Sequence, residues 1–145
     1  MQDKDFLIGI IGPTATGKTD AALLLAQNYN VEILSADASQ TRIGMEIGTA
    51  APTIEQQGFT RHHFTNFIDP DSDWNIKKFV ELAENKIKHL NKRNRIPLLV
   101  GGSGLYIWSL LEGRSIPEVK PDLELRNELE SIAETKGHEF LFNIL

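Results

Sequence analysis

The chain has 145 residues, of which 41% are hydrophobic, enough to bury the core of one domain. A formal net charge of −5 excludes a chain that is basic overall, so any nucleic-acid contact would need a local basic patch. The lack of cysteine excludes disulfides, thiolate metal sites and cysteine nucleophiles, and it is compatible with a reducing compartment.

The first forty residues alternate between predicted strands and a predicted helix. Residues 6–11 form a continuous apolar run rich in β-branched residues, which predicts a parallel strand buried on both faces. This run is too short for a signal peptide or a membrane span, so we expect a cytoplasmic protein without membrane association. A glycine-containing loop leads into a predicted helix at 20–29, and a second strand at 31–36 follows. This order predicts a right-handed βαβ unit.

The middle of the chain holds one irregular segment and then three regular elements. Glycines and prolines interrupt residues 38–75, where we expect loops with short helical turns. Apolar residues at helical spacing predict a helix at 75–91. A third strand is expected at 96–100 and a further helix at 105–111. The predicted fold class is therefore α/β, with a parallel sheet flanked by helices.

The sequence divides into two parts near residue 112. Residues 112–121 contain one glycine and two prolines, which is typical of a linker. Asp122 is a suitable N-cap for a last helix at 123–136, which Gly137 would end. We expect residues 1–112 to form the α/β core and residues 113–145 to form the linker and the start of a helical part.

The loop after the first strand meets the pattern G-x-x-x-x-G-K-[ST] in full. Its glycines allow the chain to wrap closely around an anion, and successive backbone N–H groups can point at phosphate oxygens. The helix that follows adds the positive end of its dipole, Lys18 supplies a full positive charge, and the Thr19 hydroxyl is placed to bind Mg²⁺. We therefore expect a P-loop NTPase-like fold that binds phosphate at this loop. The loop taken by itself suggests ATP as the ligand. The loop consists of Gly12, Pro13, Thr14, Ala15, Thr16, Gly17, Lys18 and Thr19.

Asp37 is the one carboxylate that directly follows a predicted strand. Ligands of open α/β sheets bind beyond the carboxyl ends of the strands, so Asp37 should share a cleft with Lys18. Asp37 could organise Mg²⁺ or accept a proton from a nucleophile, and the simpler alternative is a turn-forming aspartate. The third strand ends in Gly101-Gly102 without an acid, which weakens the prediction of a generic nucleotide hydrolase or kinase.

A set of short motifs runs along nearly the whole chain. It comprises the P-loop, residues 35–37 with Gln40, residues 44–50, Pro52-Thr53, His62-His63, Asp69-Pro70 and residues 100–106. In this order, the motifs resemble the tRNA dimethylallyltransferases, also called tRNA isopentenyltransferases. The P-loop alone is shared with many nucleotide-binding proteins, whereas its combination with Gly-Met-Glu-Ile-Gly-Thr-Ala and Gly-Gly-Ser-Gly-Leu-Tyr is far more specific.

The resemblance implies transfer of a dimethylallyl group from dimethylallyl diphosphate to N6 of an adenosine next to the anticodon of tRNA. The P-loop would bind the diphosphate, with Mg²⁺ at Thr19 and with Lys18 assisting catalysis. Asp37 matches the general base of the family, and Ser103 stands where a threonine is usual and could contact the donor or the nucleotide. The positions that the resemblance implies in tRNA binding are Asp37, Ala38, Ser39, Gln40, Ser103 and Arg126.

The resemblance also concerns architecture and partners. The chain corresponds to the N-terminal half of the family, and residues 113–145 would be the linker and the truncated beginning of a helical tRNA-binding insertion. The expected partners are tRNA and dimethylallyl diphosphate, and we expect the full-length protein to be a monomer. An inactive fragment is a possible outcome of this truncation.

The chain departs from the family pattern near the second strand. Ala38 and Ser39 replace a serine and an arginine, Arg42-Ile43 replaces a Tyr-Arg pair, and Ala51 replaces a lysine. Loss of positive charge weakens contacts to a diphosphate and to a tRNA backbone. The alternatives are an adenylate isopentenyltransferase, which prenylates a free nucleotide, and a non-catalytic nucleotide- or tRNA-binding fragment.

Two further features have simpler explanations than a site. His62-His63 are expected to be structural or to contact substrate rather than to bind metal. The basic residues between Lys77 and Arg95 favour the solvated face of an amphipathic helix over a strip that faces tRNA.

Overall fold

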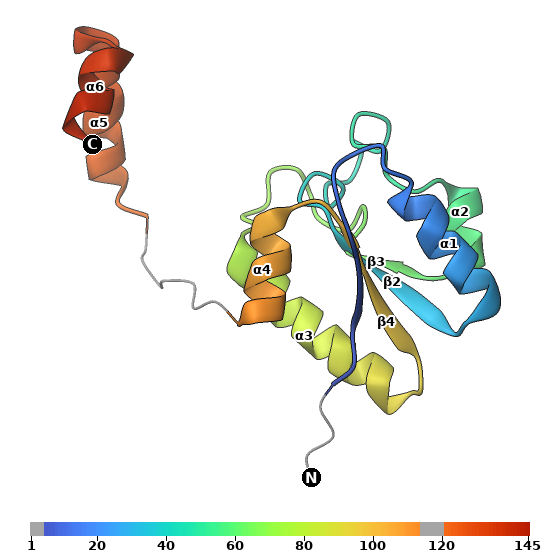
Figure 1. Cartoon of the computed structure of the whole chain (residues 1–145). Coiled ribbons are helices and arrows are strands. Elements are labelled where there is room, and N and C mark those ends of the chain that lie inside the picture. Colours follow the sequence, from blue (N-terminus) through green and yellow to red (C-terminus); the bar gives the residue numbers. More distant parts are fainter. Residues whose placement is uncertain (1–4, 114–120) are drawn as a thin grey trace.

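The computed structural model describes residues 5–113 and 121–145 (Figure 1). The first of these ranges contains a four-stranded parallel sheet in the order β1-β4-β2-β3, with helices on both faces. This confirms the predicted α/β fold class. The strands are β1 (Ile8–Ile11), β2 (Val31–Ala36), β3 (His62–His63) and β4 (Ile96–Gly101). The helices are α1 (Lys18–Asn28), α2 (Ile54–Phe59), α3 (Ile76–Lys92), α4 (Gly104–Glu112), α5 (Leu123–Lys136) and α6 (His138–Ile144).

Two hydrophobic clusters cover opposite faces of the sheet. Leu34 and Leu99 pack with α3 and α4 on one face. Ile33 and Leu98 pack with Ala22 of α1 on the other face. Successive residues of a strand point to opposite faces, so β2 and β4 contribute to both clusters. These two strands therefore form the centre of the core and fix the position of the loops that follow them.

Three elements of residues 5–113 differ from the sequence-based expectation. The prediction that the first strand is buried on both faces is wrong: β1 pairs with β4 alone among the described residues, and Ile11 is 48% exposed. α1 begins at Lys18, two residues before the predicted start at 20, and its N-cap residue, Gly17, takes a left-handed conformation (φ 78°). β3 lies inside the segment predicted to be loops and helical turns, where it pairs with Ile33 and Leu34 of β2.

The irregular segment also contains the expected helical turn. Thr53 begins α2 with a capping box, in which its Oγ1 accepts from the Gln56 N–H (3.2 Å) and its own N–H donates to Gln56 Oε1 (2.9 Å). An aromatic group then attaches the following loop to the core, with Phe64 against Phe79 of α3 and Phe67 against Trp74. The loop is therefore irregular in backbone but fixed by packing.

Residues 121–145 form two helices. α5 begins as predicted, because Asp122 Oδ1 accepts a hydrogen bond from the Leu125 N–H at 2.9 Å. α6 was not predicted; it follows after Gly137 and packs against α5. Most of the predicted linker falls on residues 114–120, outside the described residues, so the division near residue 112 stays a prediction. No helix among the described residues is long and apolar enough to cross a membrane.

Candidate functional site

Three strands end at the same level of the sheet. Ile11 of β1 lies beside Gly101 of β4, and Gly101 lies beside Ala36 of β2. The next residues of these strands, namely the P-loop, Gly102 and Asp37, therefore emerge side by side. This is the carboxyl edge, where open parallel sheets bind their ligands.

Gly101 and Gly102 allow the three segments to lie very close together. A Cβ on Gly101 would come within 2.3 Å of the Ala36 carbonyl oxygen, and a Cβ on Gly102 within 2.9 Å of the Gly12 carbonyl oxygen. Hydrogen bonds cross the same gaps, from the Gly12 N–H to the Gly101 carbonyl (3.3 Å) and from the Ser103 N–H to the Ala36 carbonyl (3.1 Å). The end of β4 is thus a spacer without side chains between the P-loop and the end of β2.

The P-loop folds tightly in front of α1. Ala15 and Gly17 have positive φ angles of 63° and 78°. Thr16 Oγ1 donates to the Pro13 carbonyl at 2.8 Å, and Lys18 Nζ donates to the same oxygen. Because α1 begins at Lys18, its first N–H groups and the positive end of its dipole face the loop. The loop collects backbone donors and one ammonium group around a helix start, which is chemistry suited to a phosphate.

A cleft of about 510 Å³ separates the P-loop from the end of β2. Residues 14–19 of the P-loop line one side of it, and Asp37, Ser39 and Gln40 line another. Residues 48–50 complete the wall. Residues 44–50 form a motif in the sequence, but the sequence alone did not indicate that they line the site. Their glycine-containing pattern was the available signal.

Asp37 is half-buried at this cleft, and its two carboxylate oxygens differ in their hydrogen bonding. Its Oδ1 accepts hydrogen bonds from the Ser39 N–H (3.0 Å) and from Ser39 Oγ (2.6 Å). Asp37 therefore forms a turn, as the simpler alternative predicted, and also faces the cleft. Its Oδ2 has no hydrogen-bond partner in the part of the chain that the structure describes. A carboxylate with one oxygen fixed and the other open is suited to accept a proton or to bind a cation.

Ser103 and Ala38 support the loop around Asp37. Ser103 Oγ accepts a hydrogen bond from the Ala38 N–H at 3.0 Å, which joins the segment after β2 to the start of α4. Neither residue belongs to the lining of the cleft. Their predicted contacts with the donor and with tRNA stay predictions.

Gln40 connects two walls of the cleft. Its Oε1 accepts from Ser35 Oγ of β2 at 3.0 Å, and its Nε2 donates to the carbonyls of Thr49 (3.3 Å) and Ala50 (3.2 Å). Ser35 is buried, so this network starts inside the sheet and ends in the facing loop. The side chain of Gln40 is thus placed to hold residues 48–50 over the cleft.

Arg126 lies on α5 and is exposed. The segment between α4 and α5 lies outside the described residues, so the predicted contact of Arg126 with tRNA stays a prediction. Residues 14–19, 37, 39 and 40 are the predicted site residues that the structure brings together.

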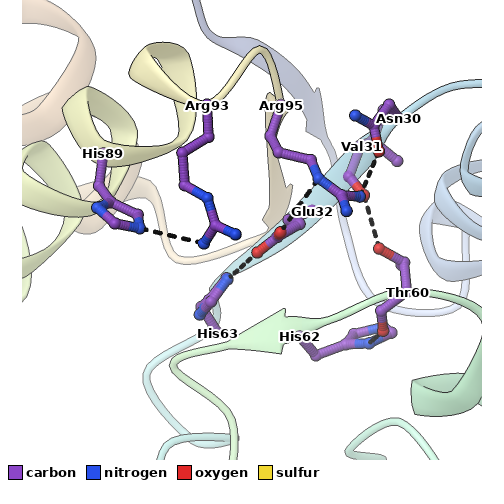
Figure 2. Close-up of polar contacts among 9 residues, drawn as sticks. All are labelled: Asn30, Val31, Glu32, Thr60, His62, His63, His89, Arg93 and Arg95. Carbon is purple, nitrogen blue, oxygen red and sulfur yellow. Dashed lines mark hydrogen bonds and ion pairs between the residues drawn. The ribbon is translucent and has the colours of Figure 1, made fainter.

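The adjacent histidines of β3 contact different partners (Figure 2). His63 Nε2 lies 2.7 Å from Glu32 Oε2, and His62 Nδ1 lies 3.0 Å from the Thr60 carbonyl. Burial lowers the pKa of both rings below the ordinary 6.5. Within residues 5–113 and 121–145, no group of three or more His, Cys, Asp or Glu side chains could hold a metal ion. His63 is therefore part of a polar contact inside the sheet.

Comparison with known proteins agrees with the motif resemblance. A family model described as IPP transferase matches residues 42–145. The chain is 47% identical over 131 residues to a tRNA dimethylallyltransferase of Chloroflexus aurantiacus, covering 90% of this chain and 44% of that protein.

Solved structures show the same relationship. The full-length tRNA isopentenylpyrophosphate transferase of Bacillus halodurans matches with a TM-score of 0.76 at 36% identity, covering 91% of this chain and 44% of that one. A eukaryotic dimethylallyltransferase acting on tRNA matches with a TM-score of 0.74 at 27% identity, covering 88% of this chain and 33% of that one. The chain thus spans less than half the length of the relatives that it matches. Since the family match extends over most of its residues, the chain belongs to the IPP transferase family.

Proposed function

We propose that this chain carries the donor site and the general base for transfer of a dimethylallyl group to N6 of an adenosine next to the anticodon of tRNA. The observation that carries the proposal is the single cleft of about 510 Å³ that both the P-loop and Asp37 line. A phosphate cradle and a carboxylate on facing walls provide a leaving-group site and a proton acceptor within one space.

The P-loop serves the diphosphate of dimethylallyl diphosphate. Backbone N–H groups at the start of α1 and the ammonium group of Lys18 offer donors and positive charge to phosphate oxygens. Negative charge grows on the diphosphate as the bond to carbon breaks, so groups fixed in the loop stabilise the transition state more than the ground state.

One bond breaks and one bond forms at C1 of the dimethylallyl group. The bond from C1 to the diphosphate oxygen breaks and its electron pair leaves with pyrophosphate, while N6 of adenine forms the new bond to C1. N6 then releases one proton, which the open Oδ2 of Asp37 accepts. An exocyclic amine is a weak nucleophile, so a positioned base is worth about 10² in rate or more. The target base must leave its stack to reach the cleft.

The residues present fit Mg²⁺ as the cofactor. The Thr19 hydroxyl is a hard oxygen donor in the same cleft as the proposed diphosphate site. Mg²⁺ takes few protein ligands when phosphates and water supply the others, so a cluster of three acidic residues is not needed. When bound, the ion would neutralise charge on the leaving pyrophosphate.

Contacts with tRNA are proposed on the rim of the cleft. Ala38 and Ser39 are exposed next to Asp37, and Gln40 holds the neighbouring loop in place. The proposal places the protein in the cytoplasm, where tRNA is the acceptor.

Label transfer tests the proposal. The protein is incubated with labelled dimethylallyl diphosphate and Mg²⁺, and either tRNA or AMP is offered as acceptor. Label in tRNA supports the proposal, whereas label in AMP supports an adenylate isopentenyltransferase. Release of phosphate from ATP without any label transfer would contradict both.

A non-catalytic fragment is the second candidate, because the chain covers only 44% of a relative such as the Chloroflexus aurantiacus enzyme. Donor binding without label in either acceptor supports this candidate. Lys18→Ala should weaken donor binding in every case, and Lys88→Ala, which removes a charge on α3 outside the cleft, should not.

A further inference from the structure

The amino edge of the sheet carries a second cleft. Three sequence-distant segments meet there, because residues 29–30 precede β2, residues 60–61 precede β3 and residues 93–95 precede β4. Parallel strands place their starting points at one edge, opposite the edge that carries the P-loop. The segments enclose about 450 Å³. The lining of this arginine cleft includes Tyr29, Glu32, Phe59, Arg61, Arg93 and Arg95.

Three guanidinium groups and one carboxylate line the arginine cleft. The carboxylate, Glu32, is only 8% exposed, and it lies between His63 and Arg95 (Figure 2). Its Oε2 is 2.7 Å from His63 Nε2, and its Oε1 is 3.8 Å from Arg95 Nε. Burial lowers the pKa of His63. A carboxylate can only accept, so the ring donates its Nε2–H to Glu32. The only carboxylate in the lining is thus already engaged by His63 and Arg95.

Arg61 and Arg93 have no carboxylate partner among the described residues. Among residues 5–113 and 121–145, the Arg61 guanidinium makes no hydrogen bond or ion pair. Within the same ranges, Arg93 contacts only His89 Nε2, at 3.4 Å (Figure 2). Both side chains are exposed at the cleft. Like charges held near one another repel, and a bound anion would relieve that repulsion. The local excess of positive charge contrasts with the net charge of −5 of the whole chain.

Hydrogen bonds fix the segments that carry the arginines. Asn30 Oδ1 accepts from Arg95, and Asn30 Nδ2 donates to the Asn94 carbonyl at 3.3 Å. Thr60 Oγ1 donates to the Val31 carbonyl at 2.6 Å, which attaches the third segment to the start of β2. The backbone of the arginine cleft is therefore organised before a ligand binds, and ordering it costs little on binding.

Two aromatic rings lie in the same lining. Tyr29 is 61% exposed and Phe59 is 51% exposed, so both can present a ring face to a ligand. Guanidinium groups bind phosphate oxygens in bidentate fashion, and aromatic rings stack on unpaired bases. The volume of the arginine cleft falls within the range of about 300 to 1,000 Å³ found for small-ligand sites.

We propose that the arginine cleft binds a nucleotide, with Arg61 and Arg93 on its phosphate and with Tyr29 or Phe59 against its base. The ligand chemistry is a phosphate beside an unstacked base, which a free nucleotide and single-stranded RNA share. The arginine cleft and the P-loop cleft have no lining residue in common, so this site is separate from the P-loop.

Equilibrium binding to the Lys18→Ala protein tests the proposal, because the P-loop is weakened in this background. The two ligands are AMP and a short single-stranded oligoadenylate. Joint replacement of Arg61 and Arg93 by alanine should lower the affinity for the preferred ligand at least about tenfold, and Tyr29→Leu should lower it roughly tenfold. The matched control Lys88→Ala removes an exposed charge outside the arginine cleft and should change the affinity less than about twofold.

The two ligands distinguish the sources of the nucleotide. Tighter binding of the oligoadenylate, weakening steeply with salt, identifies single-stranded RNA, and tighter binding of AMP identifies a free nucleotide. The proposal is overturned if neither ligand binds, or if the arginine variant binds as tightly as Lys88→Ala. Thermal unfolding checks that the variants are folded, and the exposed Arg61→Gln replaces the double variant if that one is not. Label transfer at the P-loop is a separate measurement, so the two proposals fail independently.

Discussion

The two edges of the sheet gather polar groups by different means. At the carboxyl edge, close-packed glycines and backbone N–H groups form most of the site, and Lys18 and Asp37 are its charged side chains. At the amino edge, three guanidinium groups from two separate segments form the cleft, and a buried carboxylate holds one of them. The first edge therefore depends on the close approach of backbones, whereas the second depends on side-chain charge.

Gly101→Ala should produce the largest effect, because it attacks the close approach at the carboxyl edge. The added Cβ would lie 2.3 Å from the Ala36 carbonyl oxygen, so two strands of the core must move apart. We expect the free energy of unfolding to fall by about 3 kcal/mol or more, as measured by urea denaturation. Gly58→Ala in α2 is the matched control, because its added Cβ meets nothing within 4 Å beyond its chain neighbours and the backbone of its own helix. Equal stabilities for the two variants would show that the strands are less tightly apposed.

Lys18→Ala tests whether the two edges of the sheet bind anions independently. Loss of a charge-assisted contact should lower the affinity for inorganic pyrophosphate roughly tenfold to hundredfold, measured by calorimetry with Mg²⁺. The same measurement on the variant lacking Arg61 and Arg93 should give the wild-type affinity, because neither residue lines the P-loop cleft. An equal loss in both proteins would mean that the two clefts are not independent for anions.

Gln40→Ala tests whether a side chain holds the facing wall of the P-loop cleft. The substitution leaves the buried Ser35 hydroxyl and two loop carbonyls without their partner. We expect a loss of about 1 to 2 kcal/mol in the free energy of unfolding, together with faster proteolysis between residues 44 and 51. Gln27→Ala, at an exposed position of α1, is the control. Unchanged proteolysis would show that the loop is held by other contacts.

A pH series should give the smallest effect, at the amino edge. Burial holds the pKa of His62 and of His63 below 6.5, so the unfolded chain binds these protons more tightly than the folded chain. Their contribution to stability is complete above pH 6.5 and is lost as the pH falls below it. Thermal unfolding at pH 7 and pH 5 should show a smaller difference for His63→Gln than for the wild type. His138→Gln, at an exposed position of α6, should retain the wild-type difference.

The sequence predicts those parts of the fold that depend on a pattern within one short segment. The helix at 75–91 was predicted from apolar spacing, and Phe79, Ala83, Ile87 and Leu90 are buried on it. β3 was not predicted, because two histidines carry no strand pattern and are held by pairing with β2. The edge position of β1 could not be predicted either, since strand order depends on contacts between distant segments.

The same distinction applies to the two clefts. The P-loop is contiguous, and Asp37 directly follows a strand, so their common position follows from the topology of parallel sheets. The wall at residues 48–50 depends on the hydrogen bonds of Gln40 to this loop. These are tertiary contacts, which the spacing of residues in the sequence does not predict. Arg95 was counted with a solvated basic face, yet it is partly buried and lies beside Glu32. A cleft built from scattered side chains leaves no motif in the sequence.

Single-turnover transfer of label from dimethylallyl diphosphate to tRNA, compared between the wild type and Asp37→Asn, tests most directly whether the carboxylate beside the P-loop accepts the N6 proton. The amide keeps the size of the side chain and its acceptor for the Ser39 hydrogen bonds but removes the base. We predict that Asp37→Asn binds the donor with nearly unchanged affinity and transfers label at least about 10²-fold more slowly. Transfer by Asp37→Asn at the wild-type rate would contradict the assignment of Asp37 as the base.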